Sequence, residues 1–204
     1  MFARLAPEDP FPAAVDDCWE ALQWLQHQGK QVLGLNSSKI AVAGSSAGGN
    51  LAAVMSQRSV ARQGPKILAQ VLSVPVTDNT ATIENNASWK DCQHTPALPA
   101  EKMLWYRVRY LPDTKQYADP EASPIFWQGD WSLLPPATVI VGEYDVLRAE
   151  GEDFAKNMTQ AGASAKVCLM KGMPHPFLAM DGVLEKGKES ITIMCEAIAA
   201  AFNA

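Results

Sequence analysis

The sequence predicts a single α/β domain built on a mostly parallel β-sheet with helices on both faces. Short apolar runs, too compact for helices, alternate with longer segments in which apolar residues recur every three or four positions. The connections between them are short, except for one stretch at residues 77–131. This alternation is typical of crossovers that join parallel strands and leave helices on the faces of the sheet.

The expected elements follow from the apolar pattern and from the residues that punctuate it. We expect strands at residues 40–43, 67–76, 137–142 and 165–170. We expect helices at residues 13–28, 50–63, 101–110, 148–161 and 184–202. Pro12 stands where the first helix would begin and Gly29 where it would end.

Residues 77–131 differ from the rest of the chain because they are rich in Asn, Thr, Pro and aromatic residues. We expect this stretch to be a lid-like or cap-like insertion within one domain that spans residues 1–204. Its aromatic side chains would line or cover a pocket, although packing between lid and sheet is the simpler interpretation for each one taken alone. These side chains are Trp89, Trp105, Tyr106 and Trp127.

Composition and charge exclude several classes of function. The 204 residues carry 17 basic and 22 acidic side chains, a net charge of −5, with no basic stripe that would suit nucleic acid. The four cysteines and three histidines lack metal-ligand spacing, so we expect no metal site and no disulfide framework. No secretory leader is evident, and no apolar run approaches the ~20 residues of a membrane span. We therefore expect a soluble cytoplasmic protein.

The stretch from Gly44 to Gly48 reads Gly-Ser-Ser-Ala-Gly and matches the G-x-S-x-G pattern between a predicted strand and a predicted helix. This is the context of a nucleophile elbow, in which a sharp turn exposes a serine hydroxyl at the edge of a sheet. Ser46 is the candidate nucleophile, and Gly44 and Gly48 would permit the tight turn. The backbone N–H of Ala47, at the start of the helix, would face a developing oxyanion.

A serine needs a base and a group that orients the base, and two residues occupy suitable places. Asp145 follows the predicted strand 137–142, and His175 follows the predicted strand 165–170. The chain order Ser, Asp, His, with each residue past the carboxyl end of a strand, is the order found in α/β-hydrolases. Open α/β sheets also bind their ligands at this edge.

Each of these residues also has a simpler interpretation. The glycine-rich turn at Ser46 could cradle a phosphate, but it lacks the Lys-Ser/Thr pair of a P-loop. Asp145 alone could cap a helix, and His175 alone could be an ordinary loop residue. Their order and their joint placement at strand ends favour catalysis.

These motifs resemble the hormone-sensitive-lipase-like branch of the α/β-hydrolases over essentially the whole chain. The stretch Arg4–Glu8 reads R-L-A-P-E, residues 44–49 resemble the branch's G-D-S-A-G-G elbow, and residues 145–151 resemble its D-P-L-R-D-E-G segment. The resemblance implies hydrolysis of small or short-chain carboxylic esters without a cofactor. It implies a catalytic triad of Ser46, Asp145 and His175, and pairing of two copies through residues 165–202.

The chain departs from the pattern of this branch in three ways. Ser45 stands where the family usually has aspartate, and Pro176 stands where it usually has glycine after the histidine. The H-G-G-G stretch that supplies most of the family's oxyanion hole does not occur in this sequence. By resemblance, roughly the first third of a typical member is missing. The sequence leaves open whether the chain is a fragment of a working esterase or a degenerate homologue. It also leaves open a non-catalytic homologue that binds a ligand or depends on a partner.

Overall fold

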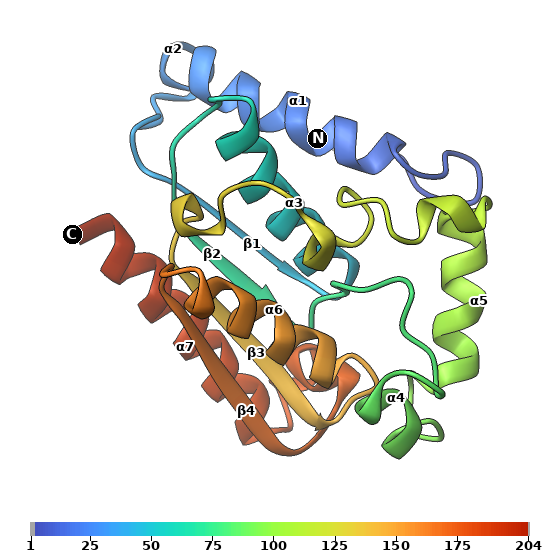
Figure 1. The fold of residues 1–204 in the computed structure, drawn as a ribbon. Helices are drawn as coiled ribbons and strands as arrows, with labels where there is room; N and C mark the ends of the chain where they lie inside the picture. The colour runs from blue at the N-terminus through green and yellow to red at the C-terminus, as the bar shows by residue number, and fades with distance from the viewer. Residues whose placement is uncertain (1–2, 204) are drawn as a thin grey trace.

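The computed structural model describes residues 3–203, and its centre is a four-stranded parallel sheet (Figure 1). The strands lie side by side in chain order. They are β1 (Ile40–Ser45), β2 (Ile67–Ser73), β3 (Ala137–Tyr144) and β4 (Ala165–Pro174). β1 and β4 therefore form the two edges of the sheet.

Helices cover both faces of this sheet, which confirms the predicted fold class. α3 (Ala47–Ala61) and α6 (Arg148–Gln160) pack on one face, and α7 (Glu185–Asn203) packs on β2 and β3 from the other (Figure 1). α1 (Ala13–His27) lies against α3 and continues into the short helix α2 (Gly29–Leu33). The connection between β2 and β3 carries α4 (Ala87–Asp91) and α5 (Ala100–Tyr110), which lie beyond the carboxyl ends of the strands (Figure 1).

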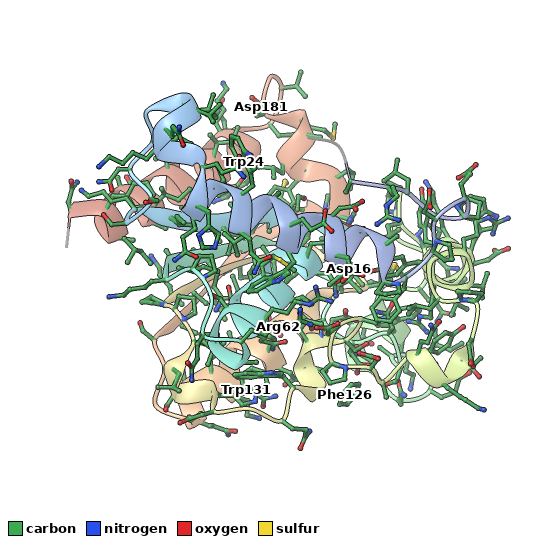
Figure 2. All side chains as sticks on the ribbon, turned by 90° about the horizontal axis from the view of Figure 1, so that it is seen from above. Asp16, Trp24, Arg62, Phe126, Trp131 and Asp181 are labelled. Atoms are coloured by element: carbon green, nitrogen blue, oxygen red, sulfur yellow. The ribbon has the colours of Figure 1, made fainter. Side chains whose placement is uncertain are left out.

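The four remaining helical turns are short 3-10 helices. They are η1 (Thr114–Gln116), η2 (Pro124–Phe126), η3 (Trp131–Leu133) and η4 (His175–Met180). η2 returns the β2–β3 connection onto α3 and α6, and η4 packs against α7. Figure 2 shows Trp131 of η3 and Asp181, which follows η4, on opposite sides of the molecule. The last part of the β2–β3 connection thus packs against α3 and α6.

The core forms a layer on each face of the sheet. Val139, Val141 and Phe154 belong to a fully buried cluster between the sheet and α6. Ile140 and Phe177 belong to a cluster on the opposite face, under α7 and η4. Alternate residues of β3 therefore point to opposite faces, as expected for a central strand that is buried on both sides.

The predicted elements are present, and their ends differ from the predictions for local reasons. α1 does not stop at a glycine cap, because Gly29 is buried against Leu25 and Leu35 and the chain turns instead at Gly34, with φ of 67°. α3 begins at Ala47, three residues before the predicted start. β2 ends at Ser73 because the next residue, Val74, has a φ of 41° that a strand does not accommodate.

The turn between β1 and α3 depends on two glycines. A Cβ added to Gly44 would overlap the backbone carbonyl of Gly48, and one added to Gly49 would lie 2.9 Å from Pro75 Cβ. A Cβ added to Gly48 meets nothing within 4 Å. The tight approach therefore lies at Gly44 and Gly49, whereas the pattern had indicated Gly44 and Gly48.

The buried side chain of Glu150 on α6 binds the β2–β3 connection. The carboxylate of Glu150 is 1% exposed and accepts hydrogen bonds from the Thr77 N–H at 2.8 Å, the Asp78 N–H at 3.2 Å and the Trp89 Nε1–H at 3.1 Å. Burial raises the pKa of Glu150 to about 8, with these hydrogen bonds opposing the shift and the Asp78 charge adding to it. The guanidinium of Arg107 lies 4.8 Å from the ring centroid of Trp89.

We expect Gly44→Ala to lower the free energy of unfolding by more than about 2 kcal/mol, since the clash is with backbone that cannot rotate away. The matched change Gly48→Ala should raise it by ~0.5–1 kcal/mol, because alanine favours the helix and the space is open. Urea denaturation followed by circular dichroism measures both. Equal effects of the two substitutions would contradict this account of the turn.

We expect Glu150→Gln to remove a pH dependence of stability. The folded-state pKa of Glu150 lies above its unfolded value, so the native state holds this proton over a wider pH range than the unfolded chain does. This stability is complete below the unfolded pKa, near pH ~4.3, and is lost as pH rises toward ~8, by at most ~1.4 kcal/mol per pH unit. Urea midpoints of the two proteins at pH 5, 6.5 and 8 should therefore diverge in favour of the glutamine variant. Parallel midpoints would show that the Glu150 carboxyl titrates near its ordinary pKa.

Candidate functional site

Ser46, Asp145 and His175 meet at the carboxyl edge of the sheet. His175 Nε2 lies 2.9 Å from Ser46 Oγ, and His175 Nδ1 lies 2.8 Å from Asp145 Oδ2. Each is the first residue after a strand, β1, β3 and β4 respectively. Because these strands are parallel members of one sheet, with β2 between β1 and β3, their carboxyl ends share one edge and bring together three residues that are far apart in the sequence.

Ser46 has a strained backbone that turns its side chain out of the strand. Its φ of 57° and ψ of −116° lie outside the regions that L-residues favour. Its N–H donates to the carbonyl of Ser73 at 2.9 Å, and its carbonyl accepts from the N–H of Val76 at 3.4 Å. Ala47 follows as the first residue of α3, where backbone N–H groups lack acceptors within the helix.

Asp145 is 1% exposed, and its two carboxylate oxygens have separate partners. Oδ1 accepts from the N–H of Leu147 at 3.0 Å, while Oδ2 faces the imidazole of His175. The hydrogen bond from the Leu147 N–H closes a local turn just before α6. Asp145 therefore supports the start of this helix, as in the capping interpretation that the sequence left open. The second contact uses the remaining oxygen, so the local turn fixes the carboxylate in the position that orients the histidine.

The loop that carries His175 is docked onto the end of β3. A Cβ added to Gly142 would lie 2.7 Å from the carbonyl oxygen of Met173. The carboxylate of Glu143 accepts the N–H of Gly172 at 2.6 Å, where the chain turns with φ of 78°. Sequence reasoning missed both supports. The only available signal was the Gly-Glu pair directly after an apolar run.

This arrangement can transfer a proton from a hydroxyl to an imidazole. The side chain of His175 is 14% exposed, so the imidazole can be reached from solvent while Asp145 behind it cannot. An imidazole between a carboxylate and a hydroxyl can accept the hydroxyl proton, and the carboxylate then stabilises the imidazolium. The geometry is thus suited to generating a serine nucleophile.

The aromatic residues of the β2–β3 connection fall into two groups. Trp89 is buried against Glu150, and Trp127 packs against Trp131 with ring centroids 6.0 Å apart. Trp105 and Tyr106 of α5 are 50% and 46% exposed. Packing, the simpler interpretation, therefore accounts for Trp89 and Trp127, whereas Trp105 and Tyr106 point outward from α5.

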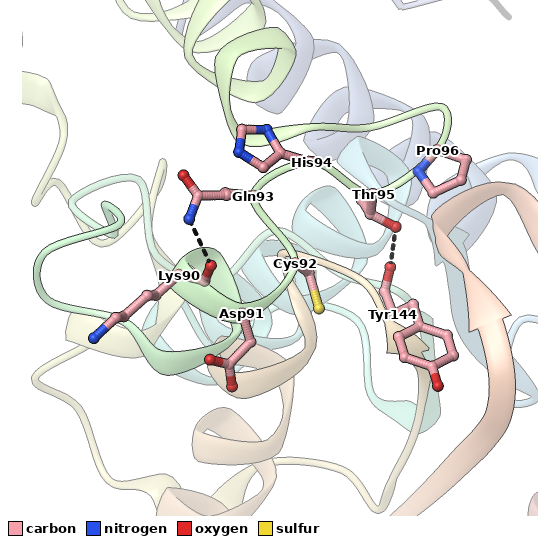
Figure 3. Close-up of a pocket in the computed structure, with 8 residues that line it drawn as sticks. All are labelled: Lys90, Asp91, Cys92, Gln93, His94, Thr95, Pro96 and Tyr144. Carbon is pink, nitrogen blue, oxygen red and sulfur yellow. Dashed lines mark hydrogen bonds between the residues drawn. The ribbon is translucent and has the colours of Figure 1, made fainter.

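A pocket of about 340 Å³ lies between the β2–β3 connection and the end of β3 (Figure 3). Thr95 Oγ1 donates to the carbonyl of Tyr144 at 2.5 Å and closes one wall (Figure 3). Cys92 lines the pocket, and burial raises the pKa of its thiol. Tyr144 directly precedes Asp145, but Ser46 and His175 do not line this pocket. Its lining residues are Lys90, Asp91, Cys92, Gln93, His94, Thr95, Pro96 and Tyr144.

Residues 3–203 contain neither a metal-binding cluster nor a membrane-spanning helix. No cluster of three or more His, Cys, Asp or Glu side chains there is arranged to hold a metal ion. None of the helices in the same range combines the length and the apolar character that crossing a bilayer requires.

Comparison with known sequences identifies a family for this chain. Residues 4–179 match the family profile described as the alpha/beta hydrolase fold. An AB hydrolase superfamily protein of Schizosaccharomyces pombe, C1039.03, is 46% identical over 98% of this chain and 59% of its own length. The ethyl acetate hydrolase of Pseudomonas putida is 30% identical over 96% of this chain and 60% of its own length. The chain thus spans about three fifths of the length of these curated relatives.

Solved structures agree with these relatives. The thermostable carboxylesterase EstE1, cloned from a metagenomic library, superposes with a TM-score of 0.91 at 37% identity and covers 98% of this chain and 67% of its own. A fungal esterase from Rhizomucor miehei superposes with a TM-score of 0.91 at 31% identity, over 98% of this chain and 62% of its own. With this fold and this match along its length, the chain belongs to the hormone-sensitive-lipase-like family of α/β-hydrolases.

Proposed function

We propose that this chain carries the catalytic centre of a carboxylesterase for small or short-chain esters, with Ser46 as nucleophile, His175 as base and Asp145 as the group that orients it. The observation that carries the proposal is the continuous hydrogen-bonded line from Ser46 Oγ through the imidazole of His175 to Asp145 Oδ2. Similarity to an ethyl acetate hydrolase and to carboxylesterases supports ester substrates.

The reaction proceeds through an acyl-enzyme. Ser46 Oγ attacks the ester carbonyl while His175 Nε2 takes the hydroxyl proton, and His175 then gives this proton to the departing alcohol. Water, deprotonated by the same imidazole, attacks the carbonyl carbon of the acyl-serine; the bond from that carbon to Ser46 Oγ breaks, the imidazolium returns its proton to Oγ, and the acid is released. Asp145 holds Nδ1 protonated and stabilises the imidazolium in both halves of the reaction. This chemistry requires no cofactor.

The backbone N–H of Ala47 is the proposed oxyanion donor. It lies next to the nucleophile at the start of α3, where the helix dipole also favours negative charge. The sequence contains no H-G-G-G stretch, so further donors from that source do not occur in it. Because the loss of one donor lowers turnover by about 10²–10³-fold, we expect slow hydrolysis by this chain.

We propose that the substrate binds under the cap-like segment 77–131, whose helices α4 and α5 lie beyond the carboxyl ends of the strands (Figure 1). The pocket at Tyr144 is adjacent to Asp145 and offers a mixed apolar and polar wall. Because neither Ser46 nor His175 lines it, this pocket does not hold the reacting carbonyl.

We expect Ser46→Ala to abolish the hydrolysis of p-nitrophenyl acetate and butyrate, since no nucleophile remains at the turn. Asp145→Asn should lower kcat by about 10⁴-fold, because the histidine would be held in the wrong tautomer. The matched control is Ser45→Ala, which removes an exposed hydroxyl beside the site and should leave kcat unchanged.

The release of p-nitrophenol by folded wild-type and variant proteins is the measurement. Equal rates for the wild type and Ser46→Ala would contradict the proposal and would favour the non-catalytic alternative. Mass spectrometry after treatment with an aryl phosphonate provides an independent check, since the adduct should form on Ser46 and be absent from Ser46→Ala.

We further propose that two copies pair through β4 and α7. β4 forms an edge of the sheet, and its Val167 and Leu169 side chains are each 40% exposed. An exposed apolar edge strand is a template for pairing with a second strand.

Light scattering of the purified chain should give about twice the monomer mass of 22.1 kDa. Leu169→Lys should shift that mass to the monomer value, because a charge in the centre of the paired edge opposes association. A wild-type chain that stays monomeric at the highest soluble concentration would contradict the pairing.

A further inference from the structure

The segment that follows β2 supports the turn at Ser46 from both sides. Ser46 donates to the carbonyl of Ser73 and accepts from the N–H of Val76. Between these two contacts lies Val74, whose φ of 41° is costly for a β-branched residue. A strained segment keeps its shape only when its surroundings fix it, so the groups that hold residues 74–78 also hold the turn.

One peptide group in this segment is bound at both of its ends. The carbonyl of Val76 accepts from Asn50 Nδ2 at 2.9 Å, and the N–H of Thr77 donates to Glu150 Oε1 at 2.8 Å. Both groups belong to the peptide between Val76 and Thr77. Asn50 and Glu150 are 3% and 1% exposed, so water does not compete for these contacts.

The two side chains come from the two helices that follow the proposed catalytic residues Ser46 and Asp145. Asn50 lies on α3, one turn after Ser46, and Glu150 lies on α6, shortly after Asp145. The peptide between them therefore links the element that carries the proposed nucleophile to the element that follows the proposed acid. The Thr77 hydroxyl adds a second link, since it donates to the backbone carbonyl of Glu150 at 2.7 Å.

The same two side chains also hold the cap-like segment. Asn50 Nδ2 donates to the carbonyl of Ala122 at 2.8 Å, and Glu150 Oε2 accepts from the indole of Trp89. We propose that Asn50 and Glu150 are positioning residues, which bind the Val76–Thr77 peptide from opposite ends and so fix the Ser46 turn against Asp145 and the cap. This proposal deepens the proposed function and rests on it for its kinetic consequence.

The test uses variants that remove one contact with little change in shape. Asn50→Leu removes the donor to Val76 and Ala122, and Glu150→Met removes the acceptor for Thr77, Asp78 and Trp89. Glu150→Gln is the conservative rescue, because its amide oxygen still accepts from Thr77. The matched control is Gln57→Leu, which removes a buried donor from the same helix α3 to the carbonyl of Pro124, 2.7 Å away, without touching this peptide.

We expect Asn50→Leu and Glu150→Met to lower kcat for p-nitrophenyl acetate by about 10- to 100-fold with KM within about twofold, since a small displacement of the nucleophile costs this much. Glu150→Gln and Gln57→Leu should keep kcat within about threefold. The double variant of Asn50→Leu with Glu150→Met should lose less than the product of the single losses, because both act through one peptide. If Gln57→Leu loses as much kcat as Asn50→Leu, the effect is general destabilisation and the positioning role is overturned.

Amide hydrogen exchange separates this proposal from the proposed function, because it does not need turnover. The Ser46, Val76 and Thr77 amides should exchange at least about tenfold faster in Asn50→Leu and Glu150→Met than in Gln57→Leu at equal global stability. An inactive wild type with this pattern would contradict the esterase assignment and support the positioning role. Unchanged protection of the Ser46 amide in both variants would overturn the positioning role, whatever the activity. If Glu150→Met does not fold, Asn50→Leu decides by the same criteria.

Discussion

The backbone conformation of Ser46 is the constraint on which the rest of the site depends. At φ of 57° and ψ of −116° this residue leaves β1 and starts α3 within a single position. This turn requires β1 and α3 to approach each other closely. The approach is possible because Gly44 and Gly49 have no Cβ atom. The hydroxyl is thereby placed above the sheet edge, at the level where the loops after β3 and β4 arrive.

Those two loops are brought to Ser46 by the parallel sheet and are then fixed by local contacts. Gly142 lets the carbonyl of Met173 approach the end of β3, and Glu143 binds the N–H of Gly172. The His175 loop is therefore attached to the strand that precedes Asp145, and these contacts fix His175 and Asp145 relative to each other without involving Ser46. Topology gives the approximate meeting point, and close backbone contacts give the hydrogen-bond distances.

Within residues 3–203, the sequence was sufficient for the fold class, for every strand and for all the long helices. The strands are short apolar runs, and the helices repeat apolar residues every three or four positions. It was also sufficient for the meeting of Ser46, Asp145 and His175, since strand ends in a parallel sheet share an edge. It did not predict Gly49, Val74 or the end of β2, because these depend on Pro75 and on how closely α3 approaches β2. The tertiary partners of such residues are absent from any local pattern.

Glu150 shows why a buried polar side chain that supports the backbone is difficult to predict from sequence, and why the structure needs it. In a helix whose other acidic residues lie at or near the surface, its carboxylate is locally indistinguishable from a solvent-facing one. An apolar side chain there would avoid the desolvation that raises its pKa, but it would leave the N–H groups of Thr77, Asp78 and Trp89 without acceptors. The strained segment after β2 exposes the N–H groups of Thr77 and Asp78 to the interior because it does not join the sheet. The polar residue is therefore a consequence of the irregular backbone, and the irregular backbone is in turn what the Ser46 turn packs against.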